Sequence, residues 1–89
     1  MRLVKDLFLH FSLEDIHKAI SNIKRSGSKY LLVNSGRAIE KNRDIETGGG
    51  YRYVNLEAEP FNFPQPIDCI DLKVFQSLLM LWEINDIVI

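Results

Sequence analysis

The clearest pattern in the sequence is an amphipathic stretch that follows Ser12. Its apolar residues recur at helical intervals and form one stripe. The stripe consists of Leu13, Ile16, Ile20 and Ile23. Ser12 is a favourable N-cap, and Asp15 stands at the third helical position, as in a shortened capping box. Gly27 can adopt the left-handed conformation that ends a helix. The pattern predicts a helix from Leu13 to Ser26.

Short apolar runs on both sides of this helix predict strands. One run is Met1 to Lys5, and the other is Lys29 to Val33. The second is apolar almost without a break, which is typical of a strand buried on both faces. Strand, helix and strand in this order predict a right-handed crossover between two parallel strands, with the helix on one face of the sheet.

Two further strands are expected near the end of the chain. They are Ile67 to Asp71 and Leu78 to Asn85, the second anchored by Trp82. The link from Leu72 to Ser77 is too short for a helical crossover, so these strands should pair antiparallel. We therefore expect one α/β domain over residues 1–89, built as strand–helix–strand, a long loop and a C-terminal antiparallel hairpin.

The long segment from Asn34 to Pro66 shows neither helical nor strand periodicity. Loops of this length are usually functional or disordered. Large side chains argue against disorder here, because they need a surface to pack on. These side chains are Tyr51, Tyr53, Leu56, Phe61 and Phe63. We predict an ordered binding-type loop that is mobile near Glu40 to Gly50.

Composition adds one discrepancy to this picture. The chain has 89 residues, yet 46% of them are hydrophobic and 10% aromatic. A domain this small buries only about two-thirds of its unfolded surface, so the apolar content favours an oligomer or a piece of a larger assembly. The net charge of −1 gives no electrostatic argument for a nucleic-acid or membrane partner. With Cys69 as the single cysteine and no visible signal peptide, we expect a reducing, cytoplasmic setting.

Motifs for metal, nucleophilic or phosphate chemistry are weak. Cys69, His10 and His17 lack the spacing of metal ligands. Cys69 is better explained as a small core residue than as a nucleophile. The run Gly48 to Gly50 lacks the Lys-Ser/Thr pair of a phosphate-binding loop, so a flexible hinge is favoured. We predict no metal site.

Two other places have the chemistry of a ligand site. Asp6 and His10 follow the first strand, where open α/β sheets bind ligands beyond the carboxyl ends of their strands. The residues alone leave open a solvated acid and an imidazole packed on Phe11. Asn55 and the run Pro60 to Pro64 offer a fixed backbone and stacking faces for a planar or apolar ligand. Attachment of the loop to the core by its phenylalanines is somewhat favoured there.

Lys5 to Ser12 reads Lys-Asp-x-x-x-His-Phe-Ser. This run resembles the Arg-Asp-x-x-x-His-Leu-Ser turn after the fourth strand of class I S-adenosylmethionine-dependent methyltransferase domains. Further segments, in order along the chain, resemble the rest of the C-terminal half of these domains. Ser26 to Leu32 resembles the start of the fifth strand. Within Asn42 to Pro66, four segments resemble the substrate-side loop, and Leu79 to Ile84 resembles the seventh strand. The resemblance implies a partial Rossmann-like sheet.

Family members also carry an earlier half, with a glycine-rich turn and an acidic residue that holds the ribose of the cofactor. Neither feature occurs in these residues. The resemblance therefore implies a fragment or subunit of a methyltransferase that is inactive alone and does not bind S-adenosylmethionine by itself. It assigns no catalytic residue. The substrate-binding residues that it implies are Asp6, His10, Thr47, Arg52, Asn55, Phe61 and Asn62.

The resemblance also places the first strand beside the absent half, which leaves one edge of the sheet unpaired. We expect a homo-oligomer, such as a dimer, or a partner chain to cover this edge. The alternative is a non-catalytic α/β module that dimerises through the open edge and serves as a structural or binding protein. Calorimetry of the purified chain with S-adenosylmethionine separates the two hypotheses.

Overall fold

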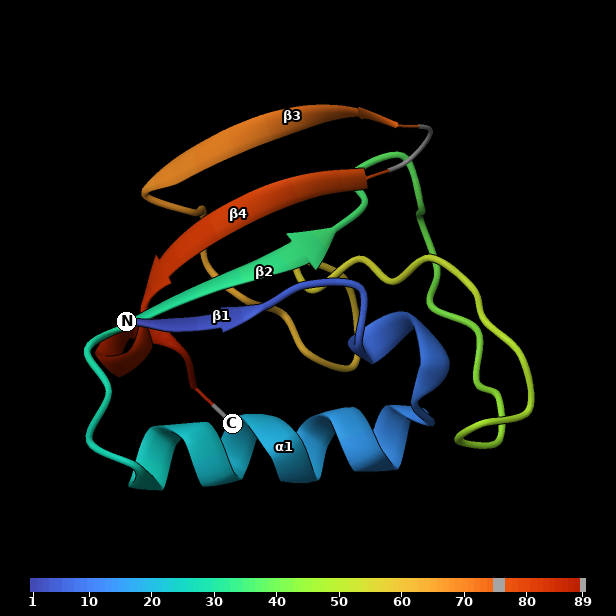
Figure 1. The fold of residues 1–89 in the computed structure, drawn as a ribbon, viewed down its shortest axis with the longest axis horizontal. Helices are drawn as coiled ribbons and strands as arrows, with labels where there is room; N and C mark the ends of the chain where they lie inside the picture. The colour runs from blue at the N-terminus through green and yellow to red at the C-terminus, as the bar shows by residue number, and fades with distance from the viewer. Residues whose placement is uncertain (75–76, 89) are drawn as a thin grey trace.

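The computed structural model describes residues 1–74 and 77–88 of the chain. Its strands, β1 (Arg2–Val4), β2 (Tyr30–Ser35), β3 (Asp68–Val74) and β4 (Ser77–Glu83), form one four-stranded mixed sheet in the order β1-β2-β4-β3 (Figure 1). The α/β class and the mixed sheet that the sequence predicts are confirmed.

The strands divide into a parallel pair and an antiparallel hairpin. β1 (Arg2–Val4) and β2 (Tyr30–Ser35) are parallel and joined through the helix α1 (Leu13–Arg25). β3 (Asp68–Val74) and β4 (Ser77–Glu83) are antiparallel, as expected from the short link between them. β4 also pairs antiparallel with β2, so the last strand lies inside the sheet. Short 3-10 turns, η1 and η2, follow β1 and β4; they span Phe8–His10 and Ile84–Asp86.

Some strand boundaries differ from the expected ones. β2 continues two residues beyond Val33, because Asn34 and Ser35 pair with β4. The expected link from Leu72 to Ser77 is too long, since Leu72–Val74 and Ser77 belong to strands. Residues 75–76 of that link lie outside the described residues.

The helix α1 forms where capping and periodicity predict it. The Ser12 hydroxyl accepts a hydrogen bond from the Asp15 N–H at 3.1 Å, which caps the first turn. The helix ends at Arg25, and Gly27 follows in the left-handed region with φ of +81°. The three isoleucines of its stripe are buried against the sheet. No helix within residues 1–74 and 77–88 is long and apolar enough to cross a bilayer.

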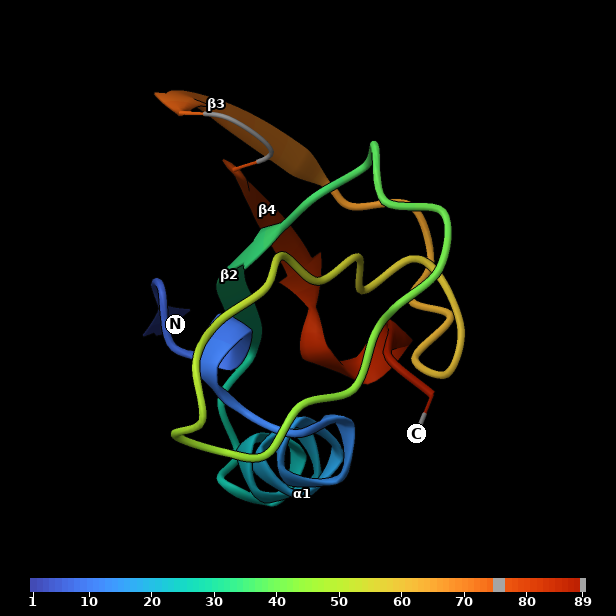
Figure 2. The same cartoon turned by 90° about the vertical axis from the view of Figure 1, so that its right-hand side faces the viewer.

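The expectation that β2 is buried on both faces is wrong. Leu31 and Val33 are buried, whereas Tyr30 and Leu32 on the opposite face are only half-buried. This alternation arises because α1 and the long loop lie on the same side of the sheet (Figure 2). Members of the resulting core include Val4, Phe8, Ile16, Ile20, Leu31, Val33, Leu56, Phe61, Met80 and Trp82.

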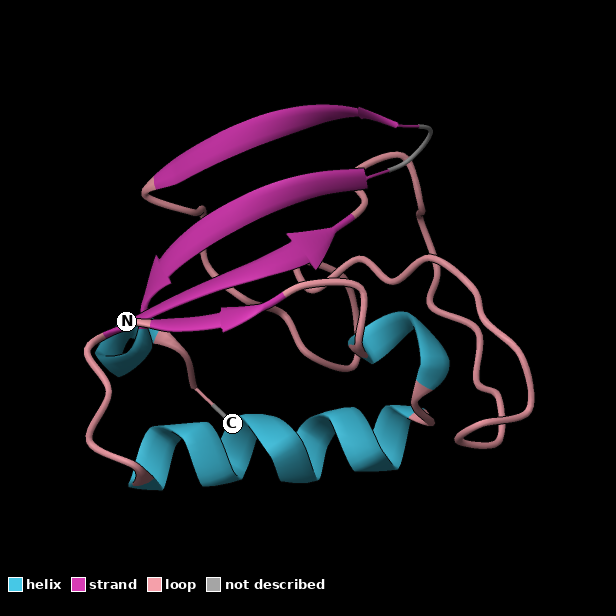
Figure 3. Ribbon diagram, in the orientation of Figure 1, coloured by secondary structure: helices cyan, strands magenta, loops and turns pink. Residues whose placement is uncertain are grey.

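Residues 36–67 contain neither helix nor strand, yet they help to build this core (Figure 3). Val54, Leu56, Phe61 and Phe63 belong to the same buried cluster as the isoleucines of α1. The Phe63 ring stands edge-on to the Trp82 ring, with centroids 5.0 Å apart. The loop therefore covers the part of the sheet that α1 leaves open. Leu56, Phe61 and Phe63 anchor it as expected, whereas Tyr51 is exposed.

Candidate functional site

The carboxyl ends of the parallel strands meet at Asp6 and Asn34. Asp6 follows β1 in the left-handed conformation, with φ of 58°. Its N–H donates to the Asn34 side-chain oxygen at 2.5 Å, which ties the turn after β1 to β2. The Asp6 carboxylate pairs with Lys5 at 3.2 Å, but both side chains are about half exposed. Such a pair contributes little stability, so the carboxylate stays accessible to a partner group.

The space beneath these strand ends is small. It encloses about 10 Å³ between residues 7–9, 33–36 and 53–54. That volume holds about one water molecule. The turn after β1 fills the position of a ligand crevice, because η1 places the Phe8 side chain in the core.

His10 lies at the end of η1 and contacts the glycine run. Its Nδ1 is 3.2 Å from the Gly50 carbonyl oxygen, which can only accept, so this contact requires a proton on Nδ1. The Gly48 N–H donates to the His10 carbonyl at 3.0 Å. The exposed His10 ring has its centroid 6.1 Å from that of Tyr51. The run Gly48 to Gly50, expected to be a hinge, is therefore attached to the turn after β1. The His10 imidazole and the Tyr51 phenol beside it are exposed to solvent.

Thr47 completes the cap of α1 from a distant loop. The Ser12 N–H donates to the Thr47 hydroxyl oxygen at 2.8 Å, and that hydroxyl donates to the Asp15 carboxylate at 2.5 Å. In a full capping box, a longer glutamate would reach the N-cap N–H itself. The Asp44 carboxylate accepts from the Leu13 N–H at 2.9 Å. The stretch 40–50, predicted to be mobile, is thus bound to the start of α1.

These contacts border an open, acidic groove of about 790 Å³. The residues that line it are Ser12, Glu14, Asp15, Asp44, Ile45, Glu46 and Thr47. Among residues 1–74 and 77–88, no three His, Cys, Asp or Glu side chains are arranged to hold a metal ion. The groove thus combines exposed carboxylates with the docking point of the loop.

We expect Asp44→Ala to lower the free energy of unfolding by about 1 kcal/mol, because the first turn of α1 loses an acceptor and a favourable charge. Urea denaturation measures the change, and amide exchange at Leu13 should accelerate. Glu46→Ala removes the same charge from the same groove and is the matched control. Equal effects of both substitutions would show that charge alone, and not the hydrogen bond, matters.

Arg52 is a buried clamp between the loop and η1. Its side chain is only 6% exposed. Nε donates to the Arg43 carbonyl at 2.6 Å, and Nη1 donates to the Phe8 and Leu9 carbonyls at 3.2 and 3.4 Å. Nη2 is buried without a hydrogen-bond partner. Burial lowers the pKa of Arg52. The Asp44 carboxylate raises this pKa, and the Arg43 cation lowers it further. The guanidinium thus binds backbone carbonyls rather than an exposed ligand.

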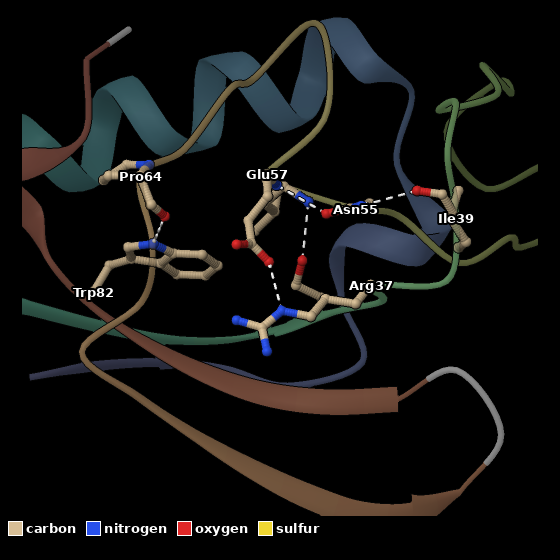
Figure 4. A network of polar contacts seen from close by, with 8 residues as sticks. Arg37, Ile39, Asn55, Glu57, Pro64 and Trp82 are labelled. Atoms are coloured by element: carbon tan, nitrogen blue, oxygen red, sulfur yellow. Dashed lines mark hydrogen bonds and ion pairs between the residues drawn. The ribbon is translucent and has the colours of Figure 1, made fainter.

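Asn55 is also engaged inside the loop (Figure 4). Its Nδ2 donates to the Ile39 carbonyl at 2.8 Å, and its Oδ1 accepts from the Glu57 N–H at 2.9 Å. Asn42 bridges the loop from the other side, because its amide donates to the Asn55 and Glu59 carbonyls at 2.8 and 2.7 Å. Asn55 is buried, so its side chain holds the loop closed on itself.

The last two residues that the resemblance implies are adjacent but face different surroundings. Phe61 is buried in the core, where its ring stands edge-on to that of Phe63. Asn62 is exposed and left-handed, with φ of 51°. Its N–H donates to the Ala58 carbonyl at 3.0 Å. Phe61 therefore packs the loop, and Asn62 marks a surface turn.

The seven residues are thus not gathered in one site. His10 and Thr47 lie in the cluster between the glycine run and α1, with Arg52 buried behind η1. Asp6 lies at the ends of the strands, and the other three are in the far part of the loop. Sequence reasoning missed Asn34, Asn42 and Asp44. The sequence signal that could have indicated them is the tendency of Asn and Asp side chains to bind backbone groups near turns.

The crevice at the ends of the parallel strands, where α/β sheets bind ligands, is too small for the S-adenosylmethionine that the resemblance implies. The strand ends enclose about 10 Å³, far less than a small-molecule site of several hundred Å³.

Comparison with known proteins leaves the family of the chain open. Scans against family models, curated proteins and solved structures each found no match. Over residues 1–74 and 77–88 the structure establishes a small α/β fold with one open, mixed four-stranded sheet and one α-helix.

Proposed function

We propose that this chain is the C-terminal half of a class I methyltransferase-like domain. It would supply the substrate-side loop and depend on a cofactor-binding half, in the same polypeptide or in a partner. The observation that carries the proposal is the position of β1. This strand pairs parallel with β2 and, among the described residues, with no other strand. The long loop returns to the turn that follows β1.

The two edges of the sheet differ in a way that supports this proposal. β3 has a register shift between Asp71 and Val74, and Lys73 is left-handed with φ of 59°. Irregularities of this kind protect a free edge from further pairing. β1 is regular over its three residues and borders a groove of about 500 Å³ next to α1. We infer that β1 is the edge of the sheet at which a partner strand pairs.

The proposed contribution of this chain is positioning. Methyl transfer is an in-line displacement at a sulfonium, so holding the acceptor in line supplies much of the rate. His10 and Tyr51 are the exposed groups that the glycine run brings together. Arg52 and Thr47 would act indirectly, since they attach the loop to η1 and α1. Asp6 would border the cofactor half from the end of β1.

Calorimetry with S-adenosylmethionine tests the proposal in two steps. The purified chain should give no binding at micromolar concentrations. Co-expression with a glycine-rich half encoded beside it should yield a complex that binds the cofactor. Binding by the chain alone would overturn the need for a second half. A stable homodimer, with no cofactor binding in any complex, would instead favour the structural module.

The role of the loop is tested in the same complex with His10→Ala. We expect methyl transfer to fall about 10- to 100-fold through loss of positioning, with an unchanged dissociation constant for S-adenosylmethionine. His17→Ala is the matched control, because His17 is exposed on α1. Equal rates for both variants would remove His10 from the substrate site.

A further inference from the structure

The edge of β1 borders a groove with an apolar floor and a basic rim. The groove lies between β1 and α1 and has a volume of about 500 Å³. Its apolar lining includes Val4, Phe8, Ala19 and Ile23. Arg2 and Lys5 are exposed at its rim. A partner at this place meets a strand edge, an apolar cleft and two cations together.

None of the described residues that line the groove carries a carboxylate. The neighbouring acid, Asp6, is adjacent to Lys5 and pairs with it at 3.2 Å. Asp6 thus offsets the charge of Lys5, and the excess positive charge of this surface rests on Arg2, although the whole chain has a net charge of −1.

A second copy of the chain is a poor partner for this surface. A two-fold dimer uses the same patch on both subunits. Self-pairing at β1 would set Arg2 and Lys5 of one copy against the same cations of the other. Juxtaposed like charges at an interface are unfavourable and select against the wrong partner. The charge pattern thus argues against the homodimer expected from the open edge.

We propose that the β1 edge and its groove bind an extended acidic segment that differs from a second copy of this chain. Strand addition supplies main-chain hydrogen bonds, and an apolar side chain of the segment fits the groove. Flanking carboxylates pair with Arg2 and Lys5, and a guanidinium can bind a carboxylate through two parallel hydrogen bonds. The inference rests on the proposed function only where it assigns the acidic segment to the cofactor-binding half. The argument from charge and shape concerns the surface of this chain alone.

A charge-reversed copy of this chain is the probe for an acidic strand. Arg2→Glu/Lys5→Glu keeps the strand edge and the groove and reverses the charge of the rim. Mixed with the unmodified chain at about 200 μM each, because small interfaces bind weakly, it should form a 1:1 complex in native mass spectrometry. Each chain alone should remain monomeric. Both chains carry net negative charge, so attraction between them must be local.

Two further measurements locate the contact. Amide shifts of the unmodified chain should change at Arg2–Val4 and near Asn22, which lines the groove. The dissociation constant should rise about tenfold from 50 to 300 mM salt, because screening weakens exposed ion pairs. The control Lys41→Glu/Lys73→Glu makes the same charge change away from the groove and should give no complex.

A homodimer of the unmodified chain with shifts at Arg2–Val4 would overturn the inference. Absence of the mixed complex would also overturn it, provided that the variant has the circular dichroism and melting temperature of the unmodified chain. If the double variant does not fold, Arg2→Glu and Lys5→Glu alone should each give a weaker complex, and failure of both is decisive. None of these experiments uses S-adenosylmethionine. The proposal about the β1 edge can therefore fail while the proposed function holds, and the reverse is also possible.

Discussion

Trp82→Ala is expected to lower the free energy of unfolding by about 3–5 kcal/mol. Total stabilities of small domains are about 5–15 kcal/mol, so the variant should lose a large share of its stability. Trp82 is 1% exposed and packs against the Phe63 ring. Its Nε1 donates to the Pro64 carbonyl at 2.7 Å (Figure 4). The substitution would leave a cavity and a carbonyl without its donor.

Urea denaturation followed by far-ultraviolet circular dichroism measures this effect. Trp82→Phe keeps most of the apolar volume and loses the hydrogen bond, so its cost should be about 1–2 kcal/mol. Tyr51→Ala removes an exposed aromatic ring from the same loop and should change stability by less than about 0.5 kcal/mol. A Trp82→Ala variant as stable as the unmodified chain would mean that the loop is not anchored on β4.

Arg52→Met should cost about 2–4 kcal/mol, the second largest effect. The substitution removes the donor that serves the carbonyls of Arg43, Phe8 and Leu9. Unsatisfied polar groups in a buried setting cost about 1–3 kcal/mol each, and methionine offers no replacement. The unpartnered Nη2 of Arg52 and its buried charge offset part of this cost. The Phe8 and Leu9 carbonyls keep their backbone donors, the N–H groups of Phe11 and residue 52, so the Arg43 carbonyl loses most. The balance still favours the native arginine.

Hydrogen exchange distinguishes this local effect from global unfolding. The N–H groups of Gly48 and Arg52 donate to the carbonyls of His10 and Leu9, and both should exchange faster in the variant. Arg43→Met is the matched control, because the side chain of Arg43 is exposed and only its carbonyl binds Arg52. Unchanged or increased stability of Arg52→Met would show that the burial of the charge costs more than its hydrogen bonds contribute.

Both substitutions test whether the long loop is a structural layer or a detachable lid. Its apolar residues lie in one core with α1 and the sheet, and its polar residues bind backbone groups of η1 and α1. We therefore expect the loop to unfold together with the sheet. This cooperativity would fix the position of His10, which the proposed function requires.

The sequence by itself determined the local elements. The spacing of Ile16, Ile20 and Ile23, with Ser12 before them and Gly27 after them, specified α1 almost to the residue. The hairpin followed from the short link between two apolar runs. These features depend on neighbouring residues, so local propensity and chain length were sufficient.

Only the tertiary structure decided how distant segments combine. Insertion of β4 between β2 and β3 is a non-local pairing that no local pattern encodes. The alternating burial of β2 depends on α1 and the loop sharing one side of the sheet. Arg52 serves a carbonyl 44 residues away, and Thr47 reaches Asp15 across 32 residues. The role of a polar side chain depends on the partner that the fold brings to it, because each buried donor or acceptor must find one.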